Sequence, residues 1–183
     1  MFNVKKLAFG AAMLAASAVC FAAPKVEIVT SEGNIVVNLN EKAAPTTVAN
    51  FVKYAKEGFY NGTIFHRVIN NFMIQGGGFD RNLHQKSTHA PIKLEDKNGL
   101  KNTVGTIAMA RTNNPATSQF FINLKDNDFL NGTSTKDGYA VFGEVVTGMD
   151  VVRKIGRAPT GSKGFMDDVP VRPVIIESVK VLK

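Results

Sequence analysis

The sequence predicts a mainly β fold, an antiparallel barrel or sandwich with helices over its open ends. Two observations predict it. Many short segments show the alternating apolar pattern of strands between glycine and asparagine, whereas only two segments have apolar residues at helical spacing. The chain has 183 residues and is 44% hydrophobic, which is enough for one domain with a core.

The first predicted element is a β-hairpin over residues 25–40, KVEIVTSEGNIVVNLN. Apolar residues alternate on both sides of its glycine-containing turn: Val26, Ile28, Ile35, Val37 and Leu39. A helix is then predicted within residues 44–60, with Thr46 or Thr47 as its cap and Gly58 at its end. Its apolar face is formed by Val48, Phe51, Val52 and Ala55.

Five strand-like segments follow: residues 63–69, 72–77, 105–111, 118–124 and 139–146. A short second helix is predicted from the spacing of Met149, Val152 and Ile155, which Gly156 follows. The last predicted element is a strand within residues 170–182, whose alternating apolar residues are Val174, Ile176, Val179 and Val181.

Residues 80–101 and 112–118 form long irregular stretches, which are usually functional in a compact domain. The triplet at residues 76–78 could suggest a phosphate-binding loop. No helix start follows it, so it is interpreted as a bend at a barrel corner. Asp167 and Asp168 are predicted to lie in a solvated turn.

The N-terminus has the pattern of a secretory signal peptide over residues 1–22. Lys5 and Lys6 precede an uncharged stretch, LAFGAAMLAASAVCFA, and cleavage is expected after Ala22. Two alternatives stay open. The stretch could anchor the chain in a membrane, although it is shorter than the ~20 residues of a span. Cys20 could instead carry a lipid, although Val19 is larger than the residue that normally precedes such a cysteine.

The composition excludes several classes of chemistry for the processed chain. Cys20 is the only cysteine, so disulfides, thiol catalysis and cysteine–metal sites are not expected. The three histidines show no metal-binding spacing, so no metal or cofactor is expected. The net charge falls from +7 to +5 when Lys5 and Lys6 are removed, and no basic run contains interleaved aromatics, so no nucleic-acid partner is expected.

Nucleophilic catalysis is also not indicated, because Ser118 has the surroundings of a strand and not of a nucleophile elbow. An enzyme with these residues would catalyse a reaction without a covalent step or a proton transfer. Rotation about an X–Pro peptide bond is such a reaction, with a barrier of ~18–20 kcal/mol. Uncatalysed, it takes on the order of tens to hundreds of seconds.

The segment FHRVINNFMIQGGG, residues 65–78, contains what this reaction requires. Twisting the amide localises a lone pair on the proline nitrogen, so a catalyst needs an apolar slot and a donor aimed at that nitrogen. Arg67 among aromatic residues and Met73 could supply both. A rate gain of four decades requires roughly 5–6 kcal/mol. A charge-assisted hydrogen bond contributes about 1.5–3 kcal/mol, so desolvation and a fixed geometry must supply the rest.

Three segments resemble cyclophilin-type peptidyl-prolyl cis–trans isomerases in order and spacing: residues 65–78, GTIAMARTNNPATSQFFINL at 105–124 and YAVFGEVVTGMDVV at 139–152. The resemblance extends from about Lys25 to Val181, and with its leader the chain is most similar to a periplasmic bacterial cyclophilin. It implies a closed eight-stranded antiparallel β-barrel with two capping α-helices. Residues 23–183 would form this isomerase domain.

The resemblance also implies roles for eleven residues. Arg67 would be catalytic, with its guanidinium directed at the carbonyl and the proline nitrogen, and Gln75 would bind the substrate backbone and steady Arg67. The proline pocket would consist of Phe72, Met73, Phe121 and Leu130. The remaining substrate-binding residues would be Ala110, Arg111, Gln119, Phe129 and Tyr139.

Each role has a structural alternative: core packing for the apolar residues, a strand-end hydrogen bond for Gln75 and a surface charge for Arg67. Phe129 and Tyr139 stand where many relatives have Trp and His. Phe lacks the indole N–H that the family uses to hold cyclosporin, so weak cyclosporin binding is expected.

The resemblance therefore implies an isomerase of proline-containing, unfolded or partly folded exported proteins in the periplasm. A monomer without stable membrane insertion is expected. Two alternatives stay open: a chaperone or adaptor whose groove binds proline peptides with incidental turnover, and a structural barrel anchored by its leader.

Overall fold

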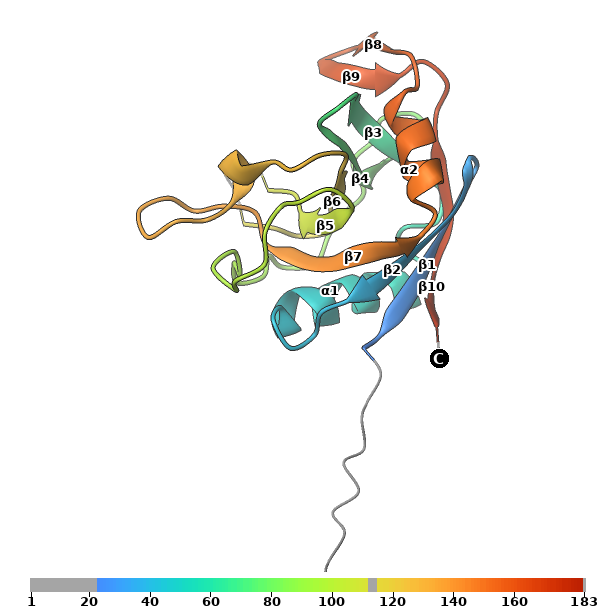
Figure 1. The fold of residues 1–183 in the computed structure, drawn as a ribbon. Helices are drawn as coiled ribbons and strands as arrows, with labels where there is room; N and C mark the ends of the chain where they lie inside the picture. Colours follow the sequence, from blue (N-terminus) through green and yellow to red (C-terminus); the bar gives the residue numbers. More distant parts are fainter. Residues whose placement is uncertain (1–22, 112–114, 183) are drawn as a thin grey trace, which may run out of the picture.

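The computed structural model describes residues 23–111 and 115–182 (Figure 1). The predicted signal peptide, residues 1–22, lies outside the described residues. In chain order the elements are β1 (Lys25–Thr30), β2 (Gly33–Leu39), α1 (Pro45–Lys56), β3 (Thr63–Ile69), β4 (Met73–Asp80), β5 (Thr106–Met109), β6 (Phe120–Asn123), the 3₁₀ helix η1 (Asp128–Leu130), β7 (Val141–Thr147), α2 (Met149–Gly156), β8 (Thr160–Lys163), β9 (Met166–Pro170) and β10 (Ile175–Leu182). None of the helices in these described ranges has the length and apolar character that crossing a bilayer requires.

Eight of the strands close into an antiparallel barrel in the order β1, β10, β3, β4, β6, β5, β7, β2. The barrel closes because β1 pairs with β2 on one side and with β10 on the other. Closure leaves none of these eight strands at the edge of a sheet, where it could pair with another chain. The prediction of a closed eight-stranded antiparallel barrel with two helices is confirmed.

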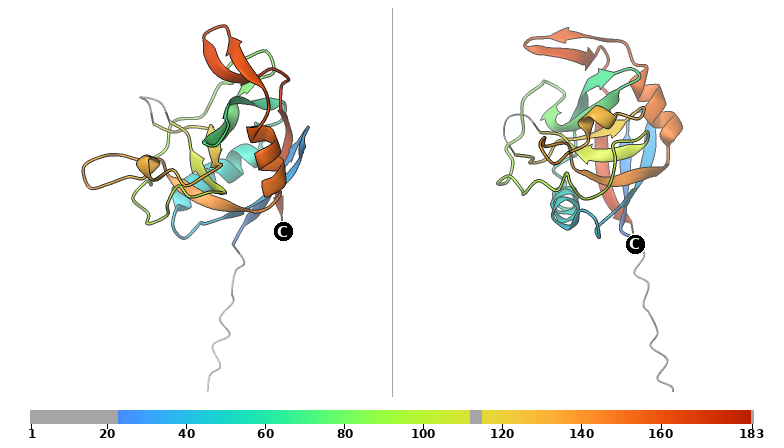
Figure 2. Two further views of the ribbon diagram at one scale, coloured as in Figure 1. Left: turned by 45° about the horizontal axis from the view of Figure 1, so that its top comes forward. Right: turned by 60° about the vertical axis from the view of Figure 1, so that its left-hand side comes forward.

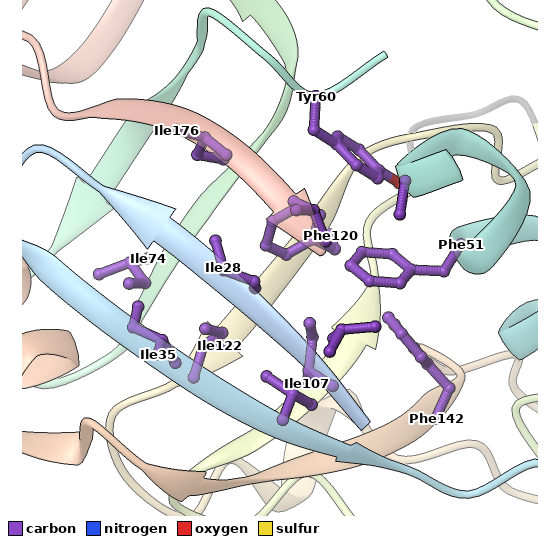
Figure 3. Close-up of a cluster of buried hydrophobic side chains, with 14 of the residues drawn as sticks. Ile28, Ile35, Phe51, Tyr60, Ile74, Ile107, Phe120, Ile122, Phe142 and Ile176 are labelled. Carbon is purple, nitrogen blue, oxygen red and sulfur yellow. The ribbon is translucent and has the colours of Figure 1, made fainter. Parts of the chain in front are cut away.

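A hydrophobic core fills the barrel interior (Figure 3). Phe51 of α1 contributes a central ring, whose centroid lies 5.1 Å from that of Tyr60, 5.4 Å from Phe120 and 5.2 Å from Phe142. Fully buried isoleucines from the strands surround these rings: Ile28, Ile35, Ile74, Ile107, Ile122 and Ile176. Because side chains occupy the interior, a substrate site has to lie on the outer surface.

The two helices pack on the barrel from opposite sides, and buried residues of both join its core (Figures 1 and 2). The predicted apolar face of α1 is confirmed for Val48, Phe51 and Ala55, which are buried. In α2, the buried residues are Val152, Ile155 and Gly156. Gly58 has φ of 67° just beyond α1, as expected of a glycine that ends a helix.

The predicted cap of α1 is wrong. The N-cap residue is Ala44, and neither threonine caps the helix. The carboxylate of Glu95 accepts hydrogen bonds from the backbone N–H groups of Thr46 at 3.1 Å and Thr47 at 2.9 Å, and from the Thr47 hydroxyl at 2.7 Å. A carboxylate at this end also complements the helix dipole, which no acidic residue of the first turn does.

Strands β8 and β9 form a hairpin outside the barrel, which projects beyond β3 in all three views (Figures 1 and 2). Asp167 and Asp168 lie in β9, so their prediction as a turn is wrong. The sequence of the hairpin shows no apolar alternation because all of β8 is exposed. Such a strand has no pattern that a periodicity argument can detect.

We expect Glu95→Gln to destabilise the protein by about 1 kcal/mol, the usual contribution of a helix N-cap. Burial raises the pKa of Glu95, but the hydrogen bonds from Thr47 and Thr46 outweigh it and hold the pKa below its ordinary value. The difference between wild type and variant should therefore shrink as Glu95 is protonated at acidic pH. Urea unfolding at pH 7 and pH 3 measures it, with exposed Glu41→Gln as the control. Equal stability of the Glu95 variant and wild type at pH 7 would contradict the capping role.

Candidate active site

The outward-facing side chains of four neighbouring strands form one row across the barrel surface. The strand register places Arg67 of β3 opposite Gln75 of β4, Gln75 opposite Phe121 of β6, and Phe121 opposite Ala108 of β5. Side chains directly opposite each other on antiparallel strands lie on the same face. The register thus brings a permanent cation, an amide and an aromatic ring into line, although they are far apart in sequence.

A β-bulge at His66 sets the direction of Arg67. The pairing of β3 with β4 steps from Phe65 opposite Gly76 to Arg67 opposite Gln75, so His66 is an extra residue on β3. Phe65 and His66 are both buried, whereas Arg67 is exposed. A bulge re-aims the residues that follow it. Here it places the guanidinium outside the barrel.

A cavity of about 250 Å³ lies over this row. Its buried residues include Met73, Phe121, Leu130 and Ala110, each at most 8% exposed. The cavity is smaller than a typical drug-sized site and suits one apolar side chain or ring. Nine residues line it, and all nine are among the eleven predicted site residues: Arg67, Phe72, Met73, Gln75, Ala110, Arg111, Phe121, Leu130 and Tyr139.

Tyr139 and Arg111 form one side of this cavity. The Tyr139 ring lies edge-on to Phe121, with centroids 5.6 Å apart and planes at 81°. The Arg111 guanidinium lies 5.4 Å from the Tyr139 ring centroid, and its Nε donates to the carbonyl of Gly138 at 2.9 Å. The Arg111 guanidinium is therefore held by a carbonyl and a ring. The second cation that lines the cavity is Arg67 of β3.

The other two predicted residues lie next to the cavity and not in its lining. Phe129 is 60% exposed and stacks on Phe72, with ring centroids 5.7 Å apart. Gln119 accepts a hydrogen bond from Nε2 of Gln75 at 3.0 Å and lines a neighbouring cavity. The Gln75 amide thus uses its Nε2 to bind Gln119, and among the described residues its Oε1 accepts no hydrogen bond from Arg67. The roles of all eleven residues in binding or catalysis stay predictions.

The neighbouring cavity has a volume of about 730 Å³ and shares Arg67, Gln75, Ala110 and Arg111 with the first. Together the two cavities form a continuous groove. The sequence predicted that residues 80–101 and 112–118 are functional stretches, without naming individual residues. It did not predict strand β9 or a role for its residues. The additional lining residues from these segments are Gln85, Thr88, Pro115, Thr117, Met166, Asp167 and Asp168.

A buried network of asparagines supports the segments that carry the pocket. Asn127 donates to the carbonyl of Phe72 at 3.0 Å and to Oδ1 of Asn123 at 2.8 Å. Asn123 in turn donates to Asn102, which donates to the carbonyl of Tyr139 at 3.3 Å. Buried amides of this kind are costly unless they are paired, so the network specifies one arrangement of these loops. No sequence motif indicates it.

His66 is largely buried and lines the larger cavity, with its ring centroid 4.6 Å from that of Phe79. Burial lowers the pKa of His66 to about 4. The imidazole is therefore neutral at neutral pH. In the described parts of the chain, no three His, Cys, Asp or Glu side chains gather into a possible metal site.

The fold and the groove define a class of protein: a closed barrel whose outer face carries a one-residue apolar pocket beside an arginine. Residues 25–181 match the family described as cyclophilin type peptidyl-prolyl cis-trans isomerase. The chain belongs to this family, and the prediction of a peptidyl-prolyl cis–trans isomerase is confirmed.

Curated relatives and solved structures agree with this assignment. A peptidyl-prolyl cis-trans isomerase of Acinetobacter baylyi is 55% identical over 97% of this chain and 96% of its own length. Peptidyl-prolyl cis-trans isomerase B of Escherichia coli K12 is 60% identical over 83% of this chain and 96% of its own. A cyclophilin-type isomerase of Cryptosporidium parvum, solved in the presence of the dipeptide Ala-Pro, has a TM-score of 0.69 and 26% identity, covering 87% of this chain and 99% of its own.

We expect the stability of the protein to fall as the pH decreases from 6.5 to about 4, with His66 as one cause. In this window the unfolded state binds a proton at His66 and the folded state does not, so acid favours unfolding. The contribution of His66 is up to about 3 kcal/mol and is complete below pH 4. Urea unfolding across this range should give a smaller loss for His66→Asn than for wild type or for the exposed-residue control His84→Asn. Equal losses in all three proteins would contradict the assignment.

Proposed function

We propose that Arg67 catalyses rotation about X–Pro bonds by hydrogen-bonding to the twisted prolyl amide while the proline ring occupies the 250 Å³ cavity. The observation that carries the proposal is that Arg67 lines the same cavity as the buried apolar residues Met73, Phe121 and Leu130. An apolar pocket removes water from the ring and from the amide beside it, which strengthens a hydrogen bond to the developing lone pair. No covalent bond forms and no proton moves.

The exposure of Arg67 suits this role. Its side chain is 45% exposed, so the guanidinium retains part of its hydration until a substrate covers it. A guanidinium is planar, always charged and rich in donors, and it can hold two acceptors of one amide at once. A carbonyl oxygen and a proline nitrogen are two such acceptors. The transition state, in which the nitrogen lone pair is localised, would gain more from this contact than the planar ground state.

The substrates we propose are proline-containing segments of unfolded or partly folded polypeptides. The larger cavity beside the proline pocket would accommodate residues that flank the proline. We further propose that the enzyme acts as a monomer, without nucleic acid or cofactor. We propose the periplasm as its compartment and exported proteins as its clients, which the sequence pattern of residues 1–22 supports. N-terminal sequencing of protein recovered from the periplasmic fraction tests this, and an intact Met1 would contradict it.

Arg67→Ala should lower kcat/KM for an X–Pro peptide by about 10- to 100-fold, the equivalent of one lost charge-assisted hydrogen bond. Arg67→Lys should recover only part of this loss, because lysine retains the charge and lacks the planar fork. NMR exchange spectroscopy on a proline tetrapeptide measures the rate, and Arg153→Ala on α2 serves as an exposed-arginine control.

Two results would exclude this mechanism. Unchanged exchange in Arg67→Ala would show that the guanidinium does not participate. Peptide binding without exchange in the wild type would favour the alternative, an adaptor that binds proline segments.

A further inference from the structure

The β8–β9 hairpin reaches the groove from outside the barrel and contacts the proposed catalytic arginine. Oδ2 of Asp168 lies 3.8 Å from Nε of Arg67. We propose that Asp168 is a positioning residue that holds Arg67 through Nε, so that the terminal nitrogens stay directed at the prolyl amide. The inference rests on the proposed function of Arg67.

Arg67 needs such a partner because little else among the described residues restrains it. Its side chain is nearly half exposed, and a long exposed side chain samples many rotamers. Gln75, which the resemblance assigned to steadying Arg67, donates to Gln119, and among the described residues its Oε1 accepts no hydrogen bond from Arg67. Within the described residues, the carboxylate that forms an ion pair with Arg67 is that of Asp168. A contact at Nε leaves the two terminal NH₂ groups available for the substrate.

The hairpin presents Asp168 in a defined position. Asp168 has φ of 59°, in the left-handed region that non-glycine residues rarely adopt. Such a conformation persists only where the surrounding structure holds it. Here β9 is paired with β8, Val169 next to Asp168 is buried, and the neighbouring Asp167 accepts a hydrogen bond from the Ser162 hydroxyl at 2.6 Å.

The charges that surround this pair are consistent with positioning. Arg111 and Asp167 line the same cavity as Arg67 and Asp168, which makes two cations and two anions. Arg111 is bound to the Gly138 carbonyl, and Asp167 is bound to Ser162. Among these four charged residues, the ion pair is the one between Asp168 and Arg67. Asp168 is itself 41% exposed, so salt should weaken the pair.

The test is Asp168→Asn, which removes the charge and keeps a side chain that tolerates the left-handed backbone. Because the pair is exposed, we expect kcat to fall by about three- to five-fold at low ionic strength, with little change in KM. The difference from wild type should shrink in ~1 M salt. Glu177→Gln, which removes an exposed carboxylate from β10, is the charge-matched control.

A double-mutant cycle shows whether Asp168 acts through Arg67. In the Arg67→Ala background, Asp168→Asn should have no further effect on exchange of the proline tetrapeptide. An equal loss in both backgrounds would overturn the inference, as would a gain of activity in Asp168→Asn, which would mean that the carboxylate holds Arg67 away from the substrate. Full activity of Asp168→Asn alongside a defective Arg67→Ala would also refute it, and the proposed function would stand. An active Arg67→Ala would refute the proposed function itself.

Discussion

A closed barrel with a filled interior fixes where both the core side chains and the surface side chains of this protein lie. Successive side chains of a strand point to opposite faces, so each barrel strand has one face for the core and one for the surface. Phe120 packs against Phe51 and Tyr60 inside, and its neighbour Phe121 lines the groove outside. In the same way, Ile74 is buried in the core and its neighbour Gln75 lines the groove. The residues that stabilise the fold therefore also determine where the site residues stand.

Segments outside the barrel strands form part of the walls of the groove. The barrel strands supply six lining residues, His66, Arg67, Met73, Gln75, Phe79 and Phe121. The remaining walls of the groove come from loops, η1 and the β8–β9 hairpin. Loops can hold a site only if their polar backbone groups are paired. The asparagine network beneath Phe72 and Tyr139 meets this need, because its amides bind the backbone of the segments that carry these rings.

The chemistry that we propose for the site is electrostatic and independent of titration near neutral pH. Arginine stays charged in proteins, and His66 beneath it is neutral because burial lowers its pKa to about 4. An isomerase that moves no proton has no need of a group that titrates near neutrality. It needs a donor of fixed direction next to an apolar surface. On this barrel the β-bulge at His66 turns the donor outward, and the register places it beside the pocket.

From the sequence alone one could predict the mainly β fold class, the core-facing residues of β1, β2, β10 and α1, and an arginine within an apolar segment. These are local properties: the alternation of Val26 and Ile28 on β1, the helical spacing of Val48 and Phe51, and an arginine within an apolar segment. The named site residues came from the resemblance of three segments to a known family and not from periodicity.

Contacts between residues far apart in the sequence could be identified only from the folded chain. Glu95 caps a helix that begins 50 residues earlier, at Pro45. Asp168 reaches Arg67 from a hairpin without apolar alternation. Such contacts depend on strand register, loop course and barrel closure, which no short window of sequence encodes.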